Sequence, residues 1–298
     1  GLNADSSIGA LIAPPTGKLL RALTTLEPGE KWLLEPKQLD DAGYFWRPGI
    51  KTGVKPGSWF HLNECFGPVL GIMSAGSLKQ AVEFQNGNDY GLTAGLQSLD
   101  ESEQQYWIEN VEAGNLYINR GTTGAIVQRQ PFGGLKRSSV GPGFKAGGLN
   151  YLYGFGRFVA EKDFTEVVVP QKREETREEN LNLEHNSHVY RGADLVIRIA
   201  PGSDHIEANA LIEGAKAAGA RVQVWNQPTL GKLPSLKPGT RIAVIGEVEP
   251  EIVELCKNPD VYLWPHELVS DADLLGLLVT RELSISRTNH RFGALLKE

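Results

Sequence analysis

A run of small residues at positions 121–125, Gly-Thr-Thr-Gly-Ala, has the composition of a loop that binds an anion. Glycine has no Cβ, so successive backbone N–H groups can converge on a negatively charged group without a side chain blocking its approach. The two donors would be the N–H groups of Gly124 and Ala125. Taken alone, the same residues would also suit an ordinary glycine-containing turn. The anion-binding interpretation therefore depends on the motifs around them.

Two other stretches carry side chains that could contact a ligand. Glu64 lies in Glu-Cys-Phe-Gly-Pro at residues 64–68, and an ionised carboxylate can only accept hydrogen bonds. Without its neighbours it would be interpreted as a solvated surface carboxylate. Phe132, in Pro-Phe-Gly-Gly at 131–134, offers an apolar ring to a ligand, to the core or to both.

Four ordered motifs together resemble the second half of the aldehyde dehydrogenase catalytic domain. The second and fourth narrow the resemblance to L-glutamate γ-semialdehyde (1-pyrroline-5-carboxylate) dehydrogenases, especially the dehydrogenase module of the bifunctional proline utilisation A flavoenzymes. The specific motifs fall within residues 1 to about 170, and the remainder resembles those enzymes more loosely. The motifs are Glu-Cys-Phe-Gly-Pro at 64–68, Asn-Arg-Gly-Thr-Thr-Gly-Ala-Ile-Val at 119–127, Gln-Pro-Phe-Gly-Gly-Leu-Lys-Arg-Ser at 130–138 and Val-Gly-Pro-Gly-Phe-Lys-Ala-Gly-Gly at 140–148.

The resemblance implies a role for each candidate residue. Glu64 would accept hydrogen bonds from the nicotinamide ribose of NAD, and Phe66 would pack beside that ribose and the nicotinamide. Gly124 and Ala125 would bind the carboxylate of glutamate γ-semialdehyde through their N–H groups. Phe132 would form a wall around the aliphatic part of the same substrate. The implied activity is NAD-dependent oxidation of this aldehyde to glutamate in proline catabolism.

The catalytic groups of the family precede the matched motifs. They are a cysteine nucleophile, a glutamate base and a Rossmann-type pyrophosphate site. The chain has two cysteines, and neither Cys65 nor Cys256 lies in the small, Gly- and Ser-rich surroundings of that nucleophile. The sequence is therefore expected to be the C-terminal portion of a longer polypeptide, with no catalytic residue of its own and inactive when isolated. The remainder of that polypeptide would oxidise proline on FAD. The alternative is a non-catalytic scaffold or oligomerisation module.

Composition agrees with an ordinary globular enzyme. A hydrophobic content of 41% and a charged content of 22% are typical of soluble domains, and a formal net charge of −6 argues against nucleic acid as a partner. No apolar run is long enough to span a bilayer, and the first residues lack the pattern of a secretory signal. We therefore expect a cytoplasmic location, no metal site, and two reduced thiols rather than a disulfide.

The pattern of elements predicts an α/β fold. Residues 14–26 place leucines at helical spacing, and helices are also expected at 77–85 and 101–111. Short apolar runs at 32–34, 44–46, 67–73 and 92–96 suit buried strands. Strands that alternate with helices predict a mostly parallel sheet. Residues 1–160 are accordingly assigned to the later part of an aldehyde dehydrogenase catalytic domain.

A flap and a charged linker are predicted for residues 161–190. The β-branched run from Phe164 to Pro170 indicates an exposed strand, which in the resembled family pairs with a neighbouring subunit; the alternative is a strand that completes its own sheet. The mixed-charge residues 172–179 and the polar residues up to His188 indicate a linker.

A second, Rossmann-like α/β domain is predicted for residues 191–298. Its strands are expected at 195–199, 221–225, 241–245 and 261–264, and its helices at 206–218, 249–256 and 271–283. It is expected to lack catalytic residues. Gly214 and Gly219 fall inside or at the end of a helix and should not hold phosphate. His185 and His188 lack a third ligand for zinc. Residues 284–293 are either a lid over the dehydrogenase module or a frayed terminus.

Overall fold

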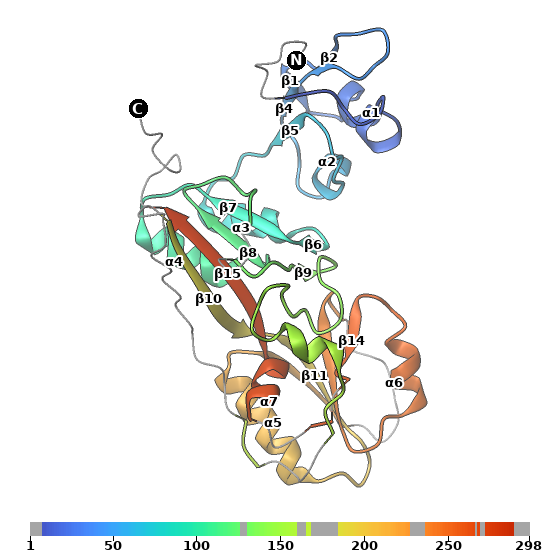
Figure 1. Ribbon diagram of the computed structural model, residues 1–298, viewed down its shortest axis with the longest axis vertical. Helices are drawn as coiled ribbons and strands as arrows, with labels where there is room; N and C mark the ends of the chain where they lie inside the picture. The colour runs from blue at the N-terminus through green and yellow to red at the C-terminus, as the bar shows by residue number, and fades with distance from the viewer. Residues whose placement is uncertain are drawn as a thin grey trace. The chain divides into compact units, whose positions relative to one another are not determined.

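The computed structural model describes residues 8–125, 130–159, 165–167, 184–226, 236–265, 267–268 and 272–288. The chain divides into two compact units, Gly1–Asn88 and Asp89–Glu298, and both mix helices with strands (Figure 1). The α/β class predicted from the sequence is confirmed. No helix among the described residues is long and apolar enough to cross a membrane.

The first unit is built around a small mixed sheet of order β1-β4-β5. Its first two strands pair antiparallel and its last two pair parallel. The predicted helix at 14–26 and the strand at 67–73 are confirmed with slightly shorter bounds, and the strand at 32–34 is confirmed and begins one residue earlier. The elements are α1 (Gly17–Thr24), β1 (Lys31–Leu34), β2 (Lys37–Gln38), β3 (Trp46–Arg47), β4 (Gly49–Thr52), α2 (Trp59–Leu62), β5 (Val69–Ile72) and α3 (Leu78–Asn86).

The second unit contains two sheets of four strands. The first has the order β10-β15-β8-β7, in which β7, β8 and β15 run parallel and β10 pairs antiparallel with β15. Helix α4 connects β7 to β8, and Asp100 caps it by accepting from the N–H groups of Ser102 and Glu103. The elements are β6 (Tyr90–Gly91), β7 (Thr93–Leu96), α4 (Glu101–Asn110), β8 (Asn115–Ile118), β9 (Leu135–Lys136), the 3₁₀ helix η1 (Tyr151–Phe155), β10 (Glu184–Gly192) and β15 (Thr280–Thr288).

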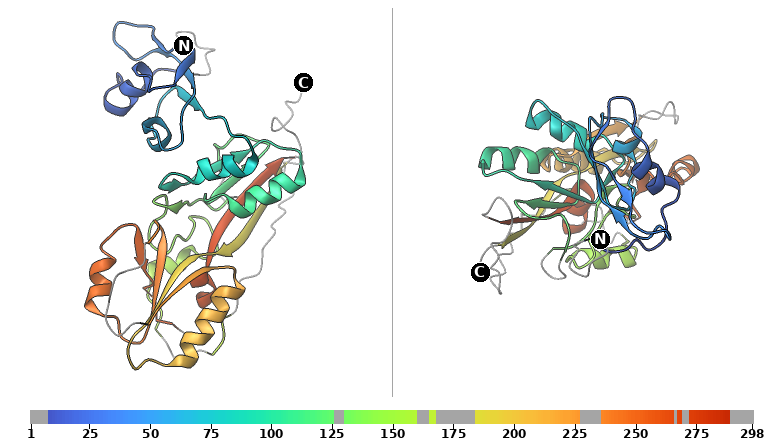
Figure 2. Two further views of the ribbon diagram at one scale, coloured as in Figure 1. Left: turned by 180° about the vertical axis from the view of Figure 1, so that it is seen from behind. Right: turned by 90° about the horizontal axis from the view of Figure 1, so that it is seen from above.

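The second sheet is fully parallel, with the order β12-β11-β13-β14. Alternate residues of β11 face opposite sides: Leu195 and Ile197 pack against α5 and α7, whereas Val196 shares a cluster with Ile252 of α6. Figure 2 shows the helices flanking this sheet. All four predicted strands are confirmed. The elements are β11 (Asp194–Ile199), α5 (His205–Ala217), β12 (Arg221–Trp225), β13 (Thr240–Ile245), α6 (Pro250–Leu255), β14 (Val261–Leu263) and α7 (Ala272–Val279).

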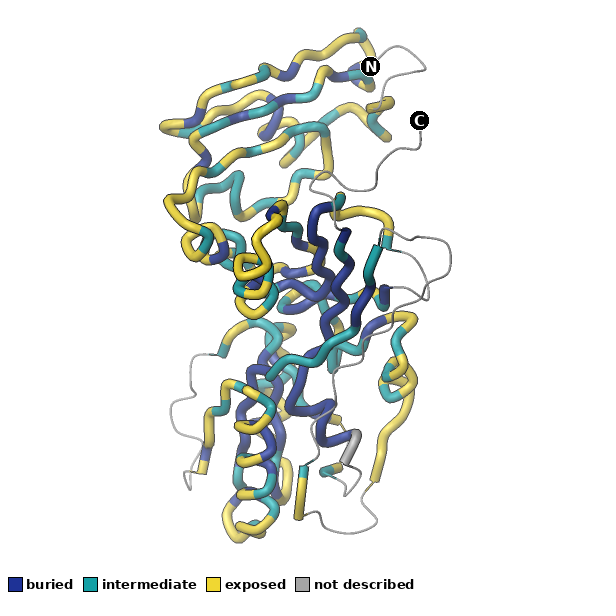
Figure 3. The backbone as a smooth tube through the Cα atoms, turned by 90° about the vertical axis from the view of Figure 1, so that its left-hand side faces the viewer, coloured by how far each residue is buried: buried dark blue, intermediate teal, exposed yellow. Residues whose placement is uncertain are grey.

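The chain passes between these two sheets through one strand-to-strand connection and one helix-to-strand connection. β10 ends at Gly192 and β11 begins at Asp194, while α7 passes into β15 between Val279 and Thr280. Figure 3 shows buried residues along the central strands β8, β15, β11 and β13. Because β15 pairs with β8, the C-terminal segment of the second unit shares a sheet with the strands near its start.

Three sequence predictions differ from the structure. The helix predicted for 271–283 ends at Val279, because Arg241 donates from Nη1 to the carbonyls of Leu277 (2.5 Å), Leu278 (2.8 Å) and Thr280 (2.5 Å) and so caps the helix end. Residues 284–288 of the predicted lid or frayed terminus belong to β15, where all but Arg287 are buried, and 289–293 lie outside the described residues.

The linker prediction fails at its end. Residues 184–190 belong to β10, whose polar side chains bond to residues outside the strands, such as Arg120, Gln130 and Asn150, so the strand lacks an apolar pattern. The domain boundaries expected near residues 160 and 190 stay predictions. Most of the predicted flap, residues 164–170, lies outside the described residues; Thr165–Val167 are described and form no strand.

Candidate functional site

Glu64 and Phe66 lie in the connection between α2 and β5 of the first unit. Both side chains are exposed, and Phe66 retains 85% of its accessible surface. The backbone of Phe66 is left-handed, with φ of +48°. That conformation costs a residue with a Cβ about 1–2 kcal/mol. An aromatic side chain held outward by a strained backbone is typical of a ligand contact.

The first unit contains a buried ion pair. Lys51 Nζ lies 3.0 Å from Glu30 Oε2, and both side chains are almost fully buried. The same ammonium sits 4.9 Å from the centre of the Trp32 ring and 4.6 Å from that of Phe60. Cys65 is half-buried, and burial raises the pKa of its thiol. A raised pKa disfavours the thiolate that a nucleophile needs.

The loop of small residues follows the carboxyl end of β8 in the second unit. Asn119 begins it in a left-handed conformation with φ of +58°, which asparagine tolerates well. Its side chain accepts from the Ser98 N–H (2.9 Å) and donates to the Ser98 carbonyl (2.8 Å), which fixes the turn. Gly124 is exposed at φ of +80°. Among the described residues, the N–H groups of Gly124 and Ala125 have no acceptor.

Phe132 lies on a second loop, whose backbone groups make several hydrogen bonds. Its N–H donates to the Ala146 carbonyl (2.9 Å), and the Ala146 N–H donates back (3.1 Å). Asn115 accepts from the Gly133 N–H (3.1 Å) and donates to the Pro131 carbonyl (3.2 Å). The ring itself is 39% exposed. The structure therefore holds the backbone of Phe132 while leaving its ring accessible.

Lys145 supports the same loop from below. Its buried ammonium donates to the carbonyls of Gly133 (2.6 Å) and Gly114 (2.7 Å) and to Asn115 Oδ1 (3.0 Å). Burial lowers the pKa of Lys145 to about 7. The Lys145 backbone N–H donates to Glu282 Oε2 (3.1 Å), and burial raises the pKa of that carboxyl. This support could not be predicted from the sequence, because lysine is normally solvated.

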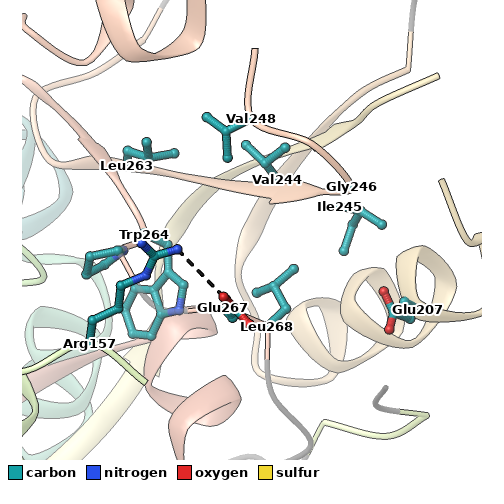
Figure 4. A pocket seen from close by; sticks show the side chains of 11 residues that line it. Arg157, Glu207, Val244, Ile245, Gly246, Val248, Leu263, Trp264, Glu267 and Leu268 are labelled. Atoms are coloured by element: carbon teal, nitrogen blue, oxygen red, sulfur yellow. Dashed lines mark ion pairs between the residues drawn. The ribbon is translucent and has the colours of Figure 1, made fainter. Parts of the chain in front are cut away.

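The second sheet carries a cavity of about 610 Å³ beside the carboxyl ends of β13 and β14 (Figure 4). Such edges bind ligands in many α/β proteins. Apolar residues such as Val248 and Leu263 line much of it, with Arg157 and Glu267 paired at 3.7 Å near its rim. Gly214 lies within α5 and Gly219 just after it, as predicted, so neither begins a helix.

Other residue types with catalytic potential are not assembled into a site. Ser203 donates to the carbonyls of Ala200 (2.7 Å) and Ile245 (2.8 Å), which is a turn contact rather than nucleophile activation. Burial raises the pKa of the Cys256 thiol at the end of α6. In the described part of the chain, no three His, Cys, Asp or Glu side chains gather as a metal ion would require.

Comparison with known proteins identifies the family. Residues 1–157 match the aldehyde dehydrogenase family. The chain belongs to this family. Proline utilisation A from Corynebacterium freiburgense is 40% identical with a TM-score of 0.81; the match covers 97% of this chain and 32% of that protein. The match is to the C-terminal aldehyde dehydrogenase portion, which confirms the resemblance inferred from the motifs.

Dehydrogenases of one named type are also similar to this aldehyde dehydrogenase chain. A 1-pyrroline-5-carboxylate dehydrogenase from Staphylococcus haemolyticus is 40% identical over 119 residues, which are 39% of this chain and 22% of that protein. A Thermus 1-pyrroline-5-carboxylate dehydrogenase with bound NAD is 36% identical, with a TM-score of 0.42, over 46% of this chain and 26% of its own. The chain thus spans less than a third of the length of the Staphylococcus and Thermus relatives.

Proposed function

We propose that this chain provides the substrate-anchoring and nicotinamide-proximal part of an NAD-dependent L-glutamate γ-semialdehyde (1-pyrroline-5-carboxylate) dehydrogenase. The observation that carries the proposal is the loop of small residues after β8. It presents the N–H groups of Gly124, whose backbone is left-handed, and of Ala125, and neither has an acceptor among the described residues. Paired N–H groups of this kind bind carboxylates. The aldehyde dehydrogenase relatives named above support the choice of substrate.

Each remaining site residue has a role in this proposal. Phe132 forms an apolar wall for the aliphatic part of the substrate, since its ring is exposed and its backbone is fixed. Glu64 and Phe66 form the NAD contact: an exposed carboxylate accepts from ribose hydroxyls, and an exposed ring packs against an apolar face. Their types and exposure fit that cofactor. NAD, when bound, accepts the hydride released by aldehyde oxidation.

In this proposal the nucleophile is supplied by an upstream part of a bifunctional polypeptide. Burial raises the pKa of both thiols in this chain, which disfavours covalent catalysis by either. FAD would serve the proline-oxidising part, and no residue here is assigned to it. Assembly of the cytoplasmic enzyme through the flap at 164–170 belongs to the same proposal.

A glycine substitution tests the carboxylate assignment. In the complete polypeptide, Gly124→Val should restrict φ and crowd the anion, lowering kcat/KM for glutamate γ-semialdehyde about tenfold more than for propanal. Gly202→Val is the matched control, because Gly202 has φ of +82° and equally open surroundings but lies after β11 in the second sheet. Equal losses for the two aldehydes in Gly124→Val would remove the carboxylate-anchor assignment.

A further inference from the structure

One carboxylate bonds to residues on both sides of the loop of small residues. Arg120 Nη1 donates to Glu184 Oε2 at 2.6 Å, and Gln130 Nε2 donates to Glu184 Oε1 at 3.3 Å. Arg120 immediately precedes residues 121–125, and Gln130 follows them. The side chains of Arg120 and Glu184 keep only 14% and 10% of their accessible surface. Glu184 begins β10, which is distant in sequence from this loop.

The neighbours of Glu184 reinforce the same arrangement. Asn186 accepts from Gln130 Nε2 (2.9 Å) and donates to Glu184 Oε1 (3.1 Å). Ser286 of β15 lies opposite Asn186, and its Oγ accepts from Arg120 Nη1 (2.7 Å). The Arg120 guanidinium lies 5.1 Å from the centre of the Tyr117 ring and reaches back to the Thr123 carbonyl (3.5 Å).

We propose that Glu184 is a positioning residue that fixes the path of the loop carrying Gly124 and Ala125. The loop has open space around Gly124, so packing does not define its path there. Its position is defined instead by one carboxylate: Arg120, directly before the loop, makes a short charge-assisted bond to Glu184, and Gln130, five positions after Ala125, makes a longer one. A glutamine at 184 would present an N–H₂ group to Arg120 or to Gln130, which are both donors, and would break one of the two contacts.

This inference deepens the proposed function, and its catalytic consequence rests on that function. If the loop anchors the substrate carboxylate, loss of the Glu184 contacts should disturb recognition of the charged aldehyde first. The structural consequence is independent of catalysis, because the hydrogen bonds exist in this chain whatever the loop binds. The two consequences can therefore be measured separately.

The first measurement uses the 298-residue chain and ¹⁵N relaxation of the Gly124 and Ala125 amides. In the native chain we expect order parameters near those of rigid backbone, about 0.85, falling toward about 0.6 in Glu184→Gln. Glu213→Gln is the matched control, since Glu213 pairs with Lys216 on the exposed surface of α5. Unchanged order parameters in Glu184→Gln would overturn the proposal.

The second measurement uses the complete polypeptide with glutamate γ-semialdehyde and propanal. Glu184→Gln should lower kcat/KM for the charged aldehyde about tenfold more than for propanal, and Glu184→Asp should restore part of the difference. If order parameters fall but the two aldehydes lose equally, Glu184 still positions the loop and the carboxylate-anchor function fails. If Glu184→Gln does not fold, Arg120→Lys probes the same contacts. Lysine keeps the charge but cannot bond to Glu184 and Ser286 at the same time. Unchanged order parameters of Gly124 and Ala125 in Arg120→Lys would also contradict the proposal.

Discussion

The two candidate substrate loops of the second unit are built in opposite ways. The loop around Phe132 has its backbone groups bonded to Asn115, Lys145 and Ala146. The loop that carries Gly124 is bonded at its two ends, through Arg120 and Gln130, while the N–H groups of Gly124 and Ala125 have no acceptor among the described residues. The backbone groups of the Phe132 loop are bonded within the protein, whereas the N–H groups of Gly124 and Ala125 have no acceptor in the described part of the chain.

This difference follows from what each loop would contact. A wall for an apolar part of a ligand needs only a well-placed side chain, so its backbone can be fully bonded. A carboxylate anchor must present unbonded N–H groups, and it can be ordered only from outside. Substitutions should therefore act on the Phe132 loop through lost hydrogen bonds and on the Gly124 loop through backbone conformation.

The largest effect is expected at the buried ammonium. Lys145→Met leaves the Gly133 carbonyl without its donor, while the Gly114 carbonyl keeps only the bond from the Ser284 N–H, so the free energy of unfolding should fall by about 2–4 kcal/mol. Chemical denaturation of the second unit would measure it. Lys257→Met, which removes an exposed lysine from its pair with Glu254, should change stability by less than about 0.5 kcal/mol. Equal effects would show that Lys145 is not a structural support.

A pH titration sharpens the same point. The pKa of Lys145 is about 7 in the folded chain, below the ordinary 10.5 of an unfolded chain. Between these values the unfolded state binds more protons, so this group raises the free energy of unfolding as pH rises from 7, by up to about 1.4 kcal/mol per pH unit. Below pH 7 its contribution is level. The stability difference between the native chain and Lys145→Met, followed with pH, checks this; a difference that stays constant above pH 7 would contradict it.

The Gly124 loop should respond to conformation alone. A Cβ at Gly124 would meet no atom within 4 Å, so Gly124→Ala should cost only the left-handed backbone, about 1–2 kcal/mol. Thermal unfolding of this variant beside Gly202→Ala, another open left-handed glycine, would test the comparison. A loss well above that of Gly202→Ala would mean that the loop is packed after all.

The smallest effect is expected at Ser284. Its Oγ donates to the Pro131 carbonyl at 2.6 Å, but Asn115 Nδ2 donates to the same oxygen at 3.2 Å. Because the carbonyl keeps a donor, Ser284→Ala should cost about 0.5–1.5 kcal/mol. Denaturant unfolding measures the change, and Asn115→Ala, which removes two bonds to this loop, should cost more. The reverse order would show that Ser284 is the main support of Pro131.

The second sheet was predictable because its strands are apolar and β-branched. Leu195 and Ile197 face one helical layer and Val196 the other, so the buried run is visible in the sequence. The β10-β15-β8-β7 sheet of the second unit was mostly not predicted, because β8, β10 and β15 were not expected as strands. β15 contains Arg281, Glu282, Ser284 and Ser286, all buried. Their polar groups bond to partners far along the chain, and no local pattern reveals those partners.

The candidate site shows the same division. Motifs identified Glu64, Phe66, Gly124, Ala125 and Phe132, and the structure places each on a loop. The residues that hold these loops were not found, because their roles depend on tertiary contacts. Glu184 was assigned to a linker on composition, although its carboxylate bonds to Arg120 and Gln130. The roles of the five motif residues remain predictions.

The parallel pairing of β8 with β15 has a consequence for biosynthesis. Arg120 and Ser286, which bond at the end of these strands, are 166 positions apart in the chain. Such distant contacts raise the contact order and slow folding, because the entropy cost of closing a long loop comes before the strand pairing stabilises the chain. During translation, β8 would wait with one edge unpaired until residues 280–288 leave the ribosome. Chaperone protection of that edge, or a pause in synthesis, would then decide how much of the protein reaches the native state.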